Sequence, residues 1–504
     1  MTPGRVTAAA CVAALSIATR AGAAADATVA CAAAELDATG RAARTFVACR
    51  AGRSRGCETT LRRALAAAER RGACEGDAGA PVAASVLGAF VDALEDGLGP
   101  AGSRCASRKL AAAGVEVAAL LRSRARDELR PHAARLADAT SRARARLDRA
   151  FARIATHEPC STATDAPEVG ARVAETVDRI VAALGVKLRT LAARTGRLIG
   201  SAVRAEVLPV DPAYGPILAR DFDYVTPENE MKWGPIHPAP DVWNFGPADA
   251  IVDFAAAHGM RVKGHNLVWD LQLPSYVNAT LTPAELAAAM ETHIRTLVGH
   301  YRGRVRAWDV VNEPLATFGA SLKHSIFLDK LGTAYLADAF RWAHEADPDA
   351  LLFVNEFGAN GVNRKSDALY ALVRDLLAQG VPIDGVGFQL HVGGFFGPLA
   401  PTLRENLQRF ADLGLLVNIS EMDVQIAGLP GDVATRLAAQ RDTYHDAVTA
   451  CLAVPACDAI TFWGFTDRYS WIDAFFGPDD PLPLDEQYVP KPAYFAVRDA
   501  LRAR

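Results

Sequence analysis

Two glutamates of this 504-residue chain directly follow short apolar segments and are of the residue type needed for acid, base and nucleophilic chemistry. Glu313 belongs to the run Trp308-Asp-Val-Val-Asn-Glu-Pro, and Glu421 ends the run Val417-Asn-Ile-Ser-Glu. Two carboxyl groups that flank a glycosidic bond can hydrolyse it, because one protonates the leaving oxygen and the other attacks the anomeric carbon. A single glutamate in such a place is usually a solvated loop residue or a helix cap, so only the pair predicts this chemistry.

The elements that must position this pair are short apolar runs that alternate with helical patterns. Eight runs are expected to be strands: 198–203, 224–226, 261–265, 307–311, 351–355, 385–389, 416–420 and 459–463. Helices are expected at 283–301, 334–346, 367–379, 402–413 and 433–453. Repeated βα units of this number predict an α/β fold, a (β/α)8 TIM barrel. Since strands four and seven lie on roughly opposite walls, Glu313 and Glu421 are expected to face each other across the barrel mouth.

The motifs around the two glutamates resemble family 10 of the glycoside hydrolases, the endo-beta-1,4-xylanases. The resemblance runs from about Leu188 to Leu501 and follows the family's order of motifs, at 226–233, 263–269, 308–314, 418–423 and 461–471. It implies retaining hydrolysis of xylan, with Glu313 as acid and then base and Glu421 as nucleophile. Burial of Glu313 and the nearby charge of Glu421 would keep Glu313 protonated near neutrality.

Other residues of these motifs are expected to support the pair or to bind sugar. Asn312 is placed to hold the 2-hydroxyl of the sugar at the scissile bond, and His391 with Asp423 is expected to hold a positive partner against Glu421. Sugar contacts are expected from the polar residues Glu228, Asn229, Lys232, His265 and Gln389 and from the aromatic residues Trp269, Trp463, Trp471 and Phe357.

Three positions depart from the family's pattern. Asp270 follows Trp269 where a His is usual, Ile472 follows Trp471 where an Arg is usual, and Phe357 replaces a frequent Tyr. None of them is one of the paired glutamates, so we expect activity to be kept. Sugar affinity and the pH profile are expected to differ from the family's.

Composition and the remaining motifs limit the partners. The small net charge of -4 predicts no polyanion partner, nucleic acid included, and the absence of a metal cluster, phosphate loop or dinucleotide fingerprint implies no cofactor or metal. The expected partner is xylan or a related plant cell-wall polysaccharide, bound by a monomer. Two alternatives stay open: another beta-1,4-glycanase acting on glucan or mixed substrates, and a non-catalytic polysaccharide-binding protein.

Residues 1–25 are typical of a secretory signal peptide, with Arg5, an apolar run from Val6 to Ala18 and the small residues 21–25. The run is too short to span a membrane, where about 20 residues are needed. We therefore expect a secreted or periplasmic protein. The alternatives are an Ala-rich first helix of a folded domain and a lipoprotein acylated at Cys11, which lacks the Leu expected three residues earlier. Cleavage near Ala25 would leave eight of the nine cysteines.

Residues 26–167 are rich in Ala and Arg and predict a helical domain, followed by a connecting helix at 168–187 and the catalytic domain at 188–504. The segment from Cys31 to Gly40 matches that from Cys105 to Gly114, and the segments before Cys74 and Cys160 match at a larger offset. These matches predict two copies of a helical hairpin, the second with a longer connection.

The repeat also predicts disulfide pairing. Ser123 and Ala143 stand in the second copy where Cys49 and Cys57 stand in the first, so both members of one pair are lost together. The predicted pairs are Cys31–Cys74, Cys49–Cys57 and Cys105–Cys160, and Cys451–Cys457 fits the family's small-loop disulfide. A zinc site is disfavoured because no CxxC pair occurs.

The role of the helical region is left open by its sequence. Residues 26–184 contain no Trp or Tyr and 24 Lys and Arg against 20 Asp and Glu. The Arg-rich stretch from Arg122 to Arg153 is interpreted as a solvated helix face, with a contact surface for an acidic polymer or cell wall as the alternative.

Overall fold

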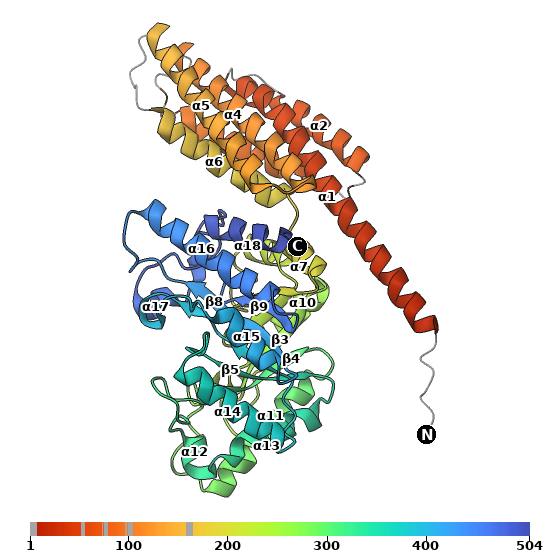
Figure 1. Cartoon of the computed structure of the whole chain (residues 1–504), viewed down its shortest axis with the longest axis vertical. Coiled ribbons are helices and arrows are strands. Elements are labelled where there is room, and N and C mark those ends of the chain that lie inside the picture. The colour runs from red at the N-terminus through yellow and green to blue at the C-terminus, as the bar shows by residue number, and fades with distance from the viewer. Residues whose placement is uncertain are drawn as a thin grey trace. The chain divides into compact units, whose positions relative to one another are not determined.

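The computed structural model describes residues 8–51, 56–72, 74, 79–95, 98, 104–157 and 165–503. Two compact units make up the chain, Met1–Thr190 and Leu191–Arg504, which run from red to yellow and from yellow to blue in Figure 1. Of the predicted signal peptide, residues 1–7 lie outside the described residues, and residues 8–25 form the first part of a long helix. No helix in the described part of the chain is both long and apolar enough to cross a membrane.

The first unit is a helical bundle. Its described helices are α1 (Ala8–Ala51), α2 (Cys57–Gly72), α3 (Gly79–Glu95), α4 (Arg104–Leu129), α5 (Ala133–His157) and α6 (Asp165–Leu184). Helices α1 and α2 form one hairpin, α4 and α5 form the second, and α1 packs along α4. Several residues that match between the copies are buried, among them Leu36 and Leu110. Part of the sequence match is therefore a match between core positions.

Two glycines at equivalent places of the repeat allow α1 and α4 to pack closely. A Cβ at Gly114 would lie 3.1 Å from the Cβ of Val47, and a Cβ at Gly40 would lie 2.9 Å from the Cγ of Arg122. Gly114 of α4 thus faces Val47 of α1, and Gly40 of α1 faces Arg122 of α4. A side chain at either glycine would push the two helices apart.

The second hairpin differs from its prediction. Helix α4 ends at Leu129 and α5 begins at Ala133, so the connection is short and the prediction of a longer one is wrong. The extra residues of the second copy lengthen its helices instead, since Ala143, the equivalent of Cys57, lies inside α5 whereas Cys57 begins α2. Without cysteines at the turn, Ala- and Arg-rich sequence continues as helix.

Disulfides link both units internally. Cys31 is bonded to Cys74, Cys49 to Cys57 and Cys451 to Cys457, as the repeat and the family resemblance predicted. The predicted Cys105–Cys160 pair lies outside the described residues because Cys160 is not among them. The Cys49–Cys57 bond closes the connection between α1 and α2.

The second unit is a closed parallel barrel. Its strands are β1 (Leu198–Val203), β2 (Tyr224–Pro227), β3 (Arg261–Val268), β4 (Ala307–Asn312), β5 (Leu351–Glu356), β6 (Gly385–Phe388), β7 (His391–Val392), β8 (Leu416–Val424) and β9 (Cys457–Phe462). They pair in the order β6-β5-β4-β3-β2-β1-β9-β8, and β6 pairs with β8 to close the ring. All eight predicted strands are present, and the (β/α)8 prediction is confirmed.

Helices surround this barrel (Figure 1). They are α7 (Leu188–Arg194), α8 (Tyr214–Asp221), α9 (Trp233–Ile236), α10 (Gly246–Ala257), α11 (Pro283–His300), α12 (Ile326–Leu331), α13 (Ala334–Ala346), α14 (Arg364–Ala378), α15 (Leu403–Ala411), α16 (Val433–Leu452), α17 (Ile472–Phe476) and α18 (Pro492–Arg502). The five predicted barrel helices correspond to α11, α13, α14, α15 and α16. On the outer side of the strands, Trp308 of β4 occupies the space over Gly264 of β3, where a Cβ would lie 2.1 Å from its ring, and it contacts Tyr301 at the end of α11.

Strand β8 is longer than predicted and carries the site. The polar residues from Glu421 onward suggested that the strand ends at Ser420, but it continues to Val424. The extension is paired, because His391 and Val392 of β7 form a parallel ladder with Asp423 and Val424. Glu421 and Asp423 therefore project from a paired strand, which fixes them more firmly than a loop would, although the register with β9 shifts between Ile419 and Met422.

Candidate active site

The predicted functional residues gather at the carboxyl ends of the barrel strands. Glu313 directly follows β4, and Glu421 lies within β8 across the barrel. Glu313 has a φ of 53°, a left-handed conformation that is uncommon for a residue with a side chain. Its backbone N–H donates to the carbonyl of Asn355 at 2.8 Å, which holds this turn in place. Such backbone strain is characteristic of functional sites.

Asn355 at the end of β5 holds the nucleophile candidate. Its amide group donates to Glu421 Oε1 at 2.6 Å and to Asn312 Oδ1 at 2.9 Å, and its oxygen accepts from the Ser420 hydroxyl at 2.6 Å. Asn355 was not among the predicted site residues. A signal was present, since Asn355-Glu356 repeats at the end of β5 the Asn312-Glu313 pattern of β4.

Gln389 connects the two glutamates. Its side-chain N–H group donates to Glu313 Oε1 at 3.1 Å and to Asn312 Oδ1 at 3.3 Å. Because Asn312 also accepts from Asn355, a continuous chain of hydrogen bonds runs from Glu313 to Glu421. Both carboxyl groups thus line one site.

His391 lies between Asp423 and Glu421. Its Nδ1 is 2.9 Å from Asp423 Oδ2, and its Nε2 is 3.3 Å from Glu421 Oε2. Burial alone would lower the pKa of His391, but the carboxylates of Asp423 and Glu421 raise it to about 10. The Nε1–H group of Trp471 also donates to Asp423 Oδ2 at 2.8 Å. His391 is therefore an imidazolium at neutral pH and faces Glu421.

Glu421 is kept ionised although it is buried. Burial raises the pKa of a carboxyl group, but the hydrogen bond from His391, the charges of His265 and His391 and the bond from Asn355 lower the pKa of Glu421 below its usual value. His265 Nδ1 lies 4.0 Å from Glu421 Oε1 and 3.0 Å from Asp309 Oδ2. A buried carboxylate stabilised in this way is suited to nucleophilic attack.

The residues after β2 form the polar wall of the site. Glu228 is fixed by Arg204 through two contacts of 2.8 and 3.0 Å, and Asn229 accepts from Lys232 Nζ at 3.1 Å. Burial lowers the pKa of Lys232, and the surrounding glutamates only partly offset this effect. Lys232 Nζ also lies 5.0 Å from the ring centre of Trp269. This wall offers hydroxyl-binding groups beside an aromatic face.

Two aromatic residues form a further wall of the site, next to His265 and His391. Trp463 directly follows β9, and its ring centre is 5.1 Å from that of His265. Trp471 precedes α17, and its ring centre is 5.1 Å from that of His391. Ile472, which stands where the family usually has an Arg, is fully buried. It therefore adds no charge to this wall.

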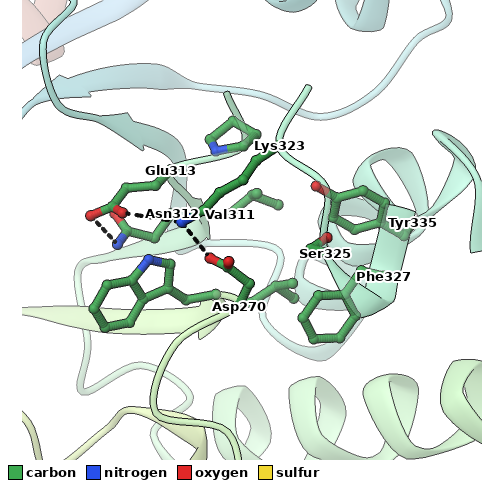
Figure 2. Close-up of a pocket in the computed structure, with 11 residues that line it drawn as sticks. Asp270, Val311, Asn312, Glu313, Lys323, Ser325, Phe327 and Tyr335 are labelled. Atoms are coloured by element: carbon green, nitrogen blue, oxygen red, sulfur yellow. Dashed lines mark hydrogen bonds and ion pairs between the residues drawn. The ribbon is translucent and has the colours of Figure 1, made fainter. Parts of the chain in front are cut away.

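The neighbourhood of Glu313 contains a partly buried ion pair, which Figure 2 shows together with Glu313. Lys323 Nζ donates to Asp270 Oδ1 at 2.8 Å and lies 3.9 Å from Glu313 Oε2. Ser325, Phe327 and Tyr335 line the same pocket behind the pair. Asp270, the departure noted in the sequence, therefore has a partner of opposite charge, and Lys323 was not predicted.

A second buried pair lies behind Glu313. Lys365 Nζ is 2.9 Å from Glu356 Oε1, and the N–H of Leu315 donates to Glu356 Oε2 at 3.0 Å. Burial raises the pKa of Glu356 to about 7, against the charge of Lys365. Lys365 Nζ also lies 3.5 Å from the ring centre of the neighbouring Phe357. Phe357 thus has one face occupied by a cation.

Phenylalanines form a rim beside the site. We call this group the phenylalanine rim: Phe318, Phe395, Phe396, Phe475 and Phe476. Phe318 and Phe475 are 81% and 75% exposed. The rim reaches the site itself, because the Phe396 ring centre is 5.0 Å from that of His391. Connected exposed rings of this kind usually mark a contact surface.

Metal-ligating residue types meet at one place in the described part of the chain, at Cys31, Glu35 and Cys74. Both sulfurs belong to one disulfide, so neither is a thiolate that binds metal.

Comparison with known proteins places similarity on the second unit. Residues 187–500 match the model of glycosyl hydrolase family 10. Endo-1,4-beta-xylanase B of Thermotoga neapolitana is 42% identical over 63% of this chain and 92% of its own length, and endo-1,4-beta-xylanase C of Phanerodontia chrysosporium is 41% identical over 62% and 78%. The crystal structure of xylanase 10B from Thermotoga maritima has a TM-score of 0.61 at 42% identity, covering 63% of this chain and 98% of that one. Xylanase 10B of Thermotoga petrophila RKU-1, in complex with xylobiose, has a TM-score of 0.60 at 41% identity.

Proposed function

Because the chain belongs to glycosyl hydrolase family 10, a family of retaining glycosidases, we propose that it is an endo-1,4-beta-xylanase that cleaves xylan through a covalent glycosyl-enzyme. The relatives named above are xylanases, and one solved neighbour is in complex with xylobiose. Xylan or a related cell-wall polysaccharide is therefore the proposed partner.

The proposed reaction uses the two glutamates in two steps. Glu313 donates its proton to the glycosidic oxygen while a Glu421 carboxylate oxygen bonds to the anomeric carbon, so that the leaving chain departs with a new hydroxyl group. Glu313, now a carboxylate, then removes a proton from water, and the resulting hydroxide attacks the anomeric carbon. The ester bond to Glu421 breaks, and Glu313 regains its proton.

The observation that carries this proposal is the contrast between the two glutamates. Glu421 receives hydrogen bonds from Asn355 and faces the imidazolium of His391, which favours its charged form. Glu313 receives hydrogen bonds from the neutral amides of Gln389 and Asn312 and lies beside a Lys323 that Asp270 already neutralises. A carboxyl pair whose surroundings differ in this way divides into a nucleophile and an acid.

Sugar binding is proposed for the residues of both walls. The polar groups are Glu228, Asn229, Lys232, His265 and Gln389, and the aromatic faces are Trp269, Trp463, Trp471 and Phe357. Asn312 is proposed to hold the 2-hydroxyl, where a hydrogen bond that strengthens in the transition state accelerates the reaction.

The first test is reducing-sugar release from xylan, carboxymethylcellulose and mixed-linkage glucan, with analysis of product lengths. We expect the highest rate on xylan and a mixture of short products from early time points. A higher rate on either glucan would make the protein a different beta-1,4-glycanase. No release from any of the three would leave the polysaccharide-binding alternative.

A second test assigns the two glutamates individually. Glu421→Ala is expected to abolish hydrolysis, and azide should partly restore turnover by giving a glycosyl azide of inverted configuration. Glu313→Ala with azide and an activated substrate should give a glycosyl azide of retained configuration, because azide then attacks the covalent intermediate. Exchange of the two outcomes would reverse the assignment.

We also propose an organisation for the whole chain. The basic and apolar start at 1–25 is proposed to direct export, and the disulfides fit an oxidising compartment such as the cell exterior or periplasm. Residues 26–167 are proposed as a helical domain, 168–187 as its connecting helix and 188–504 as the catalytic domain of a monomer. Mass spectrometry of secreted protein would locate the mature N-terminus.

A further inference from the structure

One helix of the first unit carries a row of arginines that the hydrolytic reaction does not use. The arginine row consists of Arg135, Arg142, Arg146, Arg149 and Arg153 on α5. We propose that this row is a binding surface for a carboxylate-bearing polysaccharide, that is, a polymer that contains uronic acid units.

Positive charge is concentrated in one hairpin of the chain, and negative charge in the barrel. Residues 104–157, which form α4 and α5, contain 13 Lys and Arg against 5 Asp and Glu, a net charge of +8. The rest of Met1–Thr190 is balanced at 15 against 15, whereas Leu191–Arg504 contains 26 against 38, a net charge of -12. A negative polymer is therefore attracted by this one hairpin and repelled by the barrel.

Spacing places the arginines in one line. The intervals along the row are seven, four, three and four residues. At 3.6 residues per turn these positions fall within about 60° of one another, and at 1.5 Å per residue the row is about 27 Å long. Side chains three or four residues apart have Cβ atoms about 5–6 Å apart, which is close to the length of one pyranose unit. The row thus matches a chain of sugars that each carry a carboxylate.

The row is exposed and largely uncompensated. Its five arginines are all exposed. Arg142 pairs with Asp138 of the same helix, but Arg146, Arg149 and Arg153 form no ion pair with another described residue. Arg144, on the other side of α5, is 3.6 Å from Asp148. Ion pairing on α5 therefore leaves most of the row available to a ligand.

Two hollows follow the row. One of about 310 Å³ lies between α4 and α5 and is lined by Arg146, Arg149, Arg153 and the buried Glu116. The other, of about 480 Å³, lies at the connection between α4 and α5, where the helices of this hairpin are longer than those of the first. It is lined by Arg126, Arg130, Arg135 and Arg142. Burial, partly offset by the charge of Arg144, raises the pKa of Glu116 to about 7. Glu116 thus opposes an anion less than an ordinary carboxylate would.

Other polyanions fit the unit less well. It contains no Trp or Tyr on which nucleic-acid bases could stack. The apolar residues of α5, Ala143, Leu147 and Phe151, are buried against the bundle, so the helix offers no apolar face to a bilayer. Arginine binds carboxylates in paired hydrogen bonds. The choice of a polysaccharide rests on the proposed function of the barrel, since both units would then act on one material.

The test is affinity electrophoresis of the full chain through gels that contain polygalacturonate, neutral arabinoxylan or no polymer. We expect polygalacturonate to retard the wild-type protein more than neutral arabinoxylan does, with retardation that falls as salt increases. The variant Arg146→Gln/Arg149→Gln/Arg153→Gln should bind polygalacturonate at least about tenfold more weakly, because three exposed charge contacts are lost. Gln keeps the helix, which far-ultraviolet circular dichroism verifies.

The control removes three exposed arginines from the first hairpin, as Arg62→Gln/Arg63→Gln/Arg70→Gln. It should bind polygalacturonate as the wild type does. Equal loss in both variants would show a response to net charge only and would overturn the proposal, as would wild-type binding by the α5 variant. Tighter binding of double-stranded DNA than of polygalacturonate would also overturn it. Binding of polygalacturonate is measured without any hydrolysis. A failure of the xylanase assignment would therefore appear in the reducing-sugar assay and not in this one.

Discussion

The Asp270 carboxylate and the Lys323 ammonium group form an ion pair of 2.8 Å in the wall beside Glu313. Lys323 lies 3.9 Å from Glu313 Oε2, so its charge would favour the ionised form of the acid if Asp270 did not compensate it. The pair is largely enclosed, since the two side chains are 17% and 20% exposed. Removing either member therefore changes the charge that Glu313 experiences.

The first prediction concerns the alkaline limb of the pH–activity profile. Asp270→Asn leaves Lys323 uncompensated, which favours loss of the Glu313 proton and should move the limb to lower pH by roughly 0.5 to 1 unit. Lys323→Met leaves Asp270 uncompensated and should move it to higher pH. The double variant should return toward the wild-type profile. Shifts of the same sign in both single variants would contradict this account.

The second prediction concerns the acidic limb. His391→Gln removes the cation that faces Glu421, so Glu421 should bind a proton more readily and the acidic limb should move to higher pH by about one unit or more. The profile of kcat/KM against pH measures this change. His445→Gln, an exposed position on α16, is the control and should leave both limbs in place. An unchanged acidic limb in His391→Gln would show that His391 has only a structural role.

The third prediction concerns alkaline stability. Because the pKa of His391 is raised to about 10 in the folded protein, its stabilising contribution is complete below the ordinary pKa near 6.5 and is lost as the pH rises through about 10. Unfolding by urea should therefore become easier between these pH values. His391→Gln should show a weaker dependence over the same range, and an identical dependence would count against the raised pKa.

The fourth prediction concerns Gly387, which has no side chain and lies against Asn355. A Cβ at Gly387 would lie 2.3 Å from Asn355 Oδ1, so Gly387→Ala should displace the amide that holds Glu421. We expect kcat to fall at least about tenfold and stability to fall by about 1–3 kcal/mol from overpacking. Gly299→Ala on α11, where a Cβ meets nothing within 4 Å, is the control and should keep kcat without any loss of stability. Wild-type kcat in Gly387→Ala would remove Asn355 from the proposed machinery.

The fifth prediction concerns the phenylalanine rim. Phe395→Ala/Phe476→Ala removes two exposed rings that stack at 6.4 Å, so KM for polymeric xylan should rise about three- to tenfold. Hydrolysis of an aryl xylobioside, which offers these rings fewer sugar units to contact, should be less affected. Val433→Ala, an exposed apolar position on α16, is the control. If activity fell equally on both substrates, the two substitutions would be acting through folding and not through contact with the polymer.

The sequence predicted the barrel well because its information is local and repeated. Eight apolar runs with helical patterns between them describe a closed parallel sheet, and the ends of β4 and β8 bring Glu313 and Glu421 to one mouth. The extent of β8 was not predictable in this way, since polar residues normally end a strand, and pairing with β7 and β9 keeps Glu421 and Asp423 within this one.

Contacts between distant residues were harder to infer. Asn355 and Lys323 each act through a partner on another strand or loop, and no local pattern shows which partner that is. The helix pairing of the first unit followed from its duplication, whereas the length of its second hairpin did not. A larger offset between repeats is equally compatible with a longer loop and with longer helices, and only the fold decides between them.

The distribution of two aromatic residue types has a practical consequence for the study of this chain. All seven Trp and all ten Tyr lie between residues 191 and 504. Intrinsic ultraviolet fluorescence therefore originates in the barrel alone, whereas the circular dichroism of α-helix includes the disulfide-linked bundle. Recording both signals during one thermal scan of the intact protein separates the melting of the two units without cutting the chain or adding a dye.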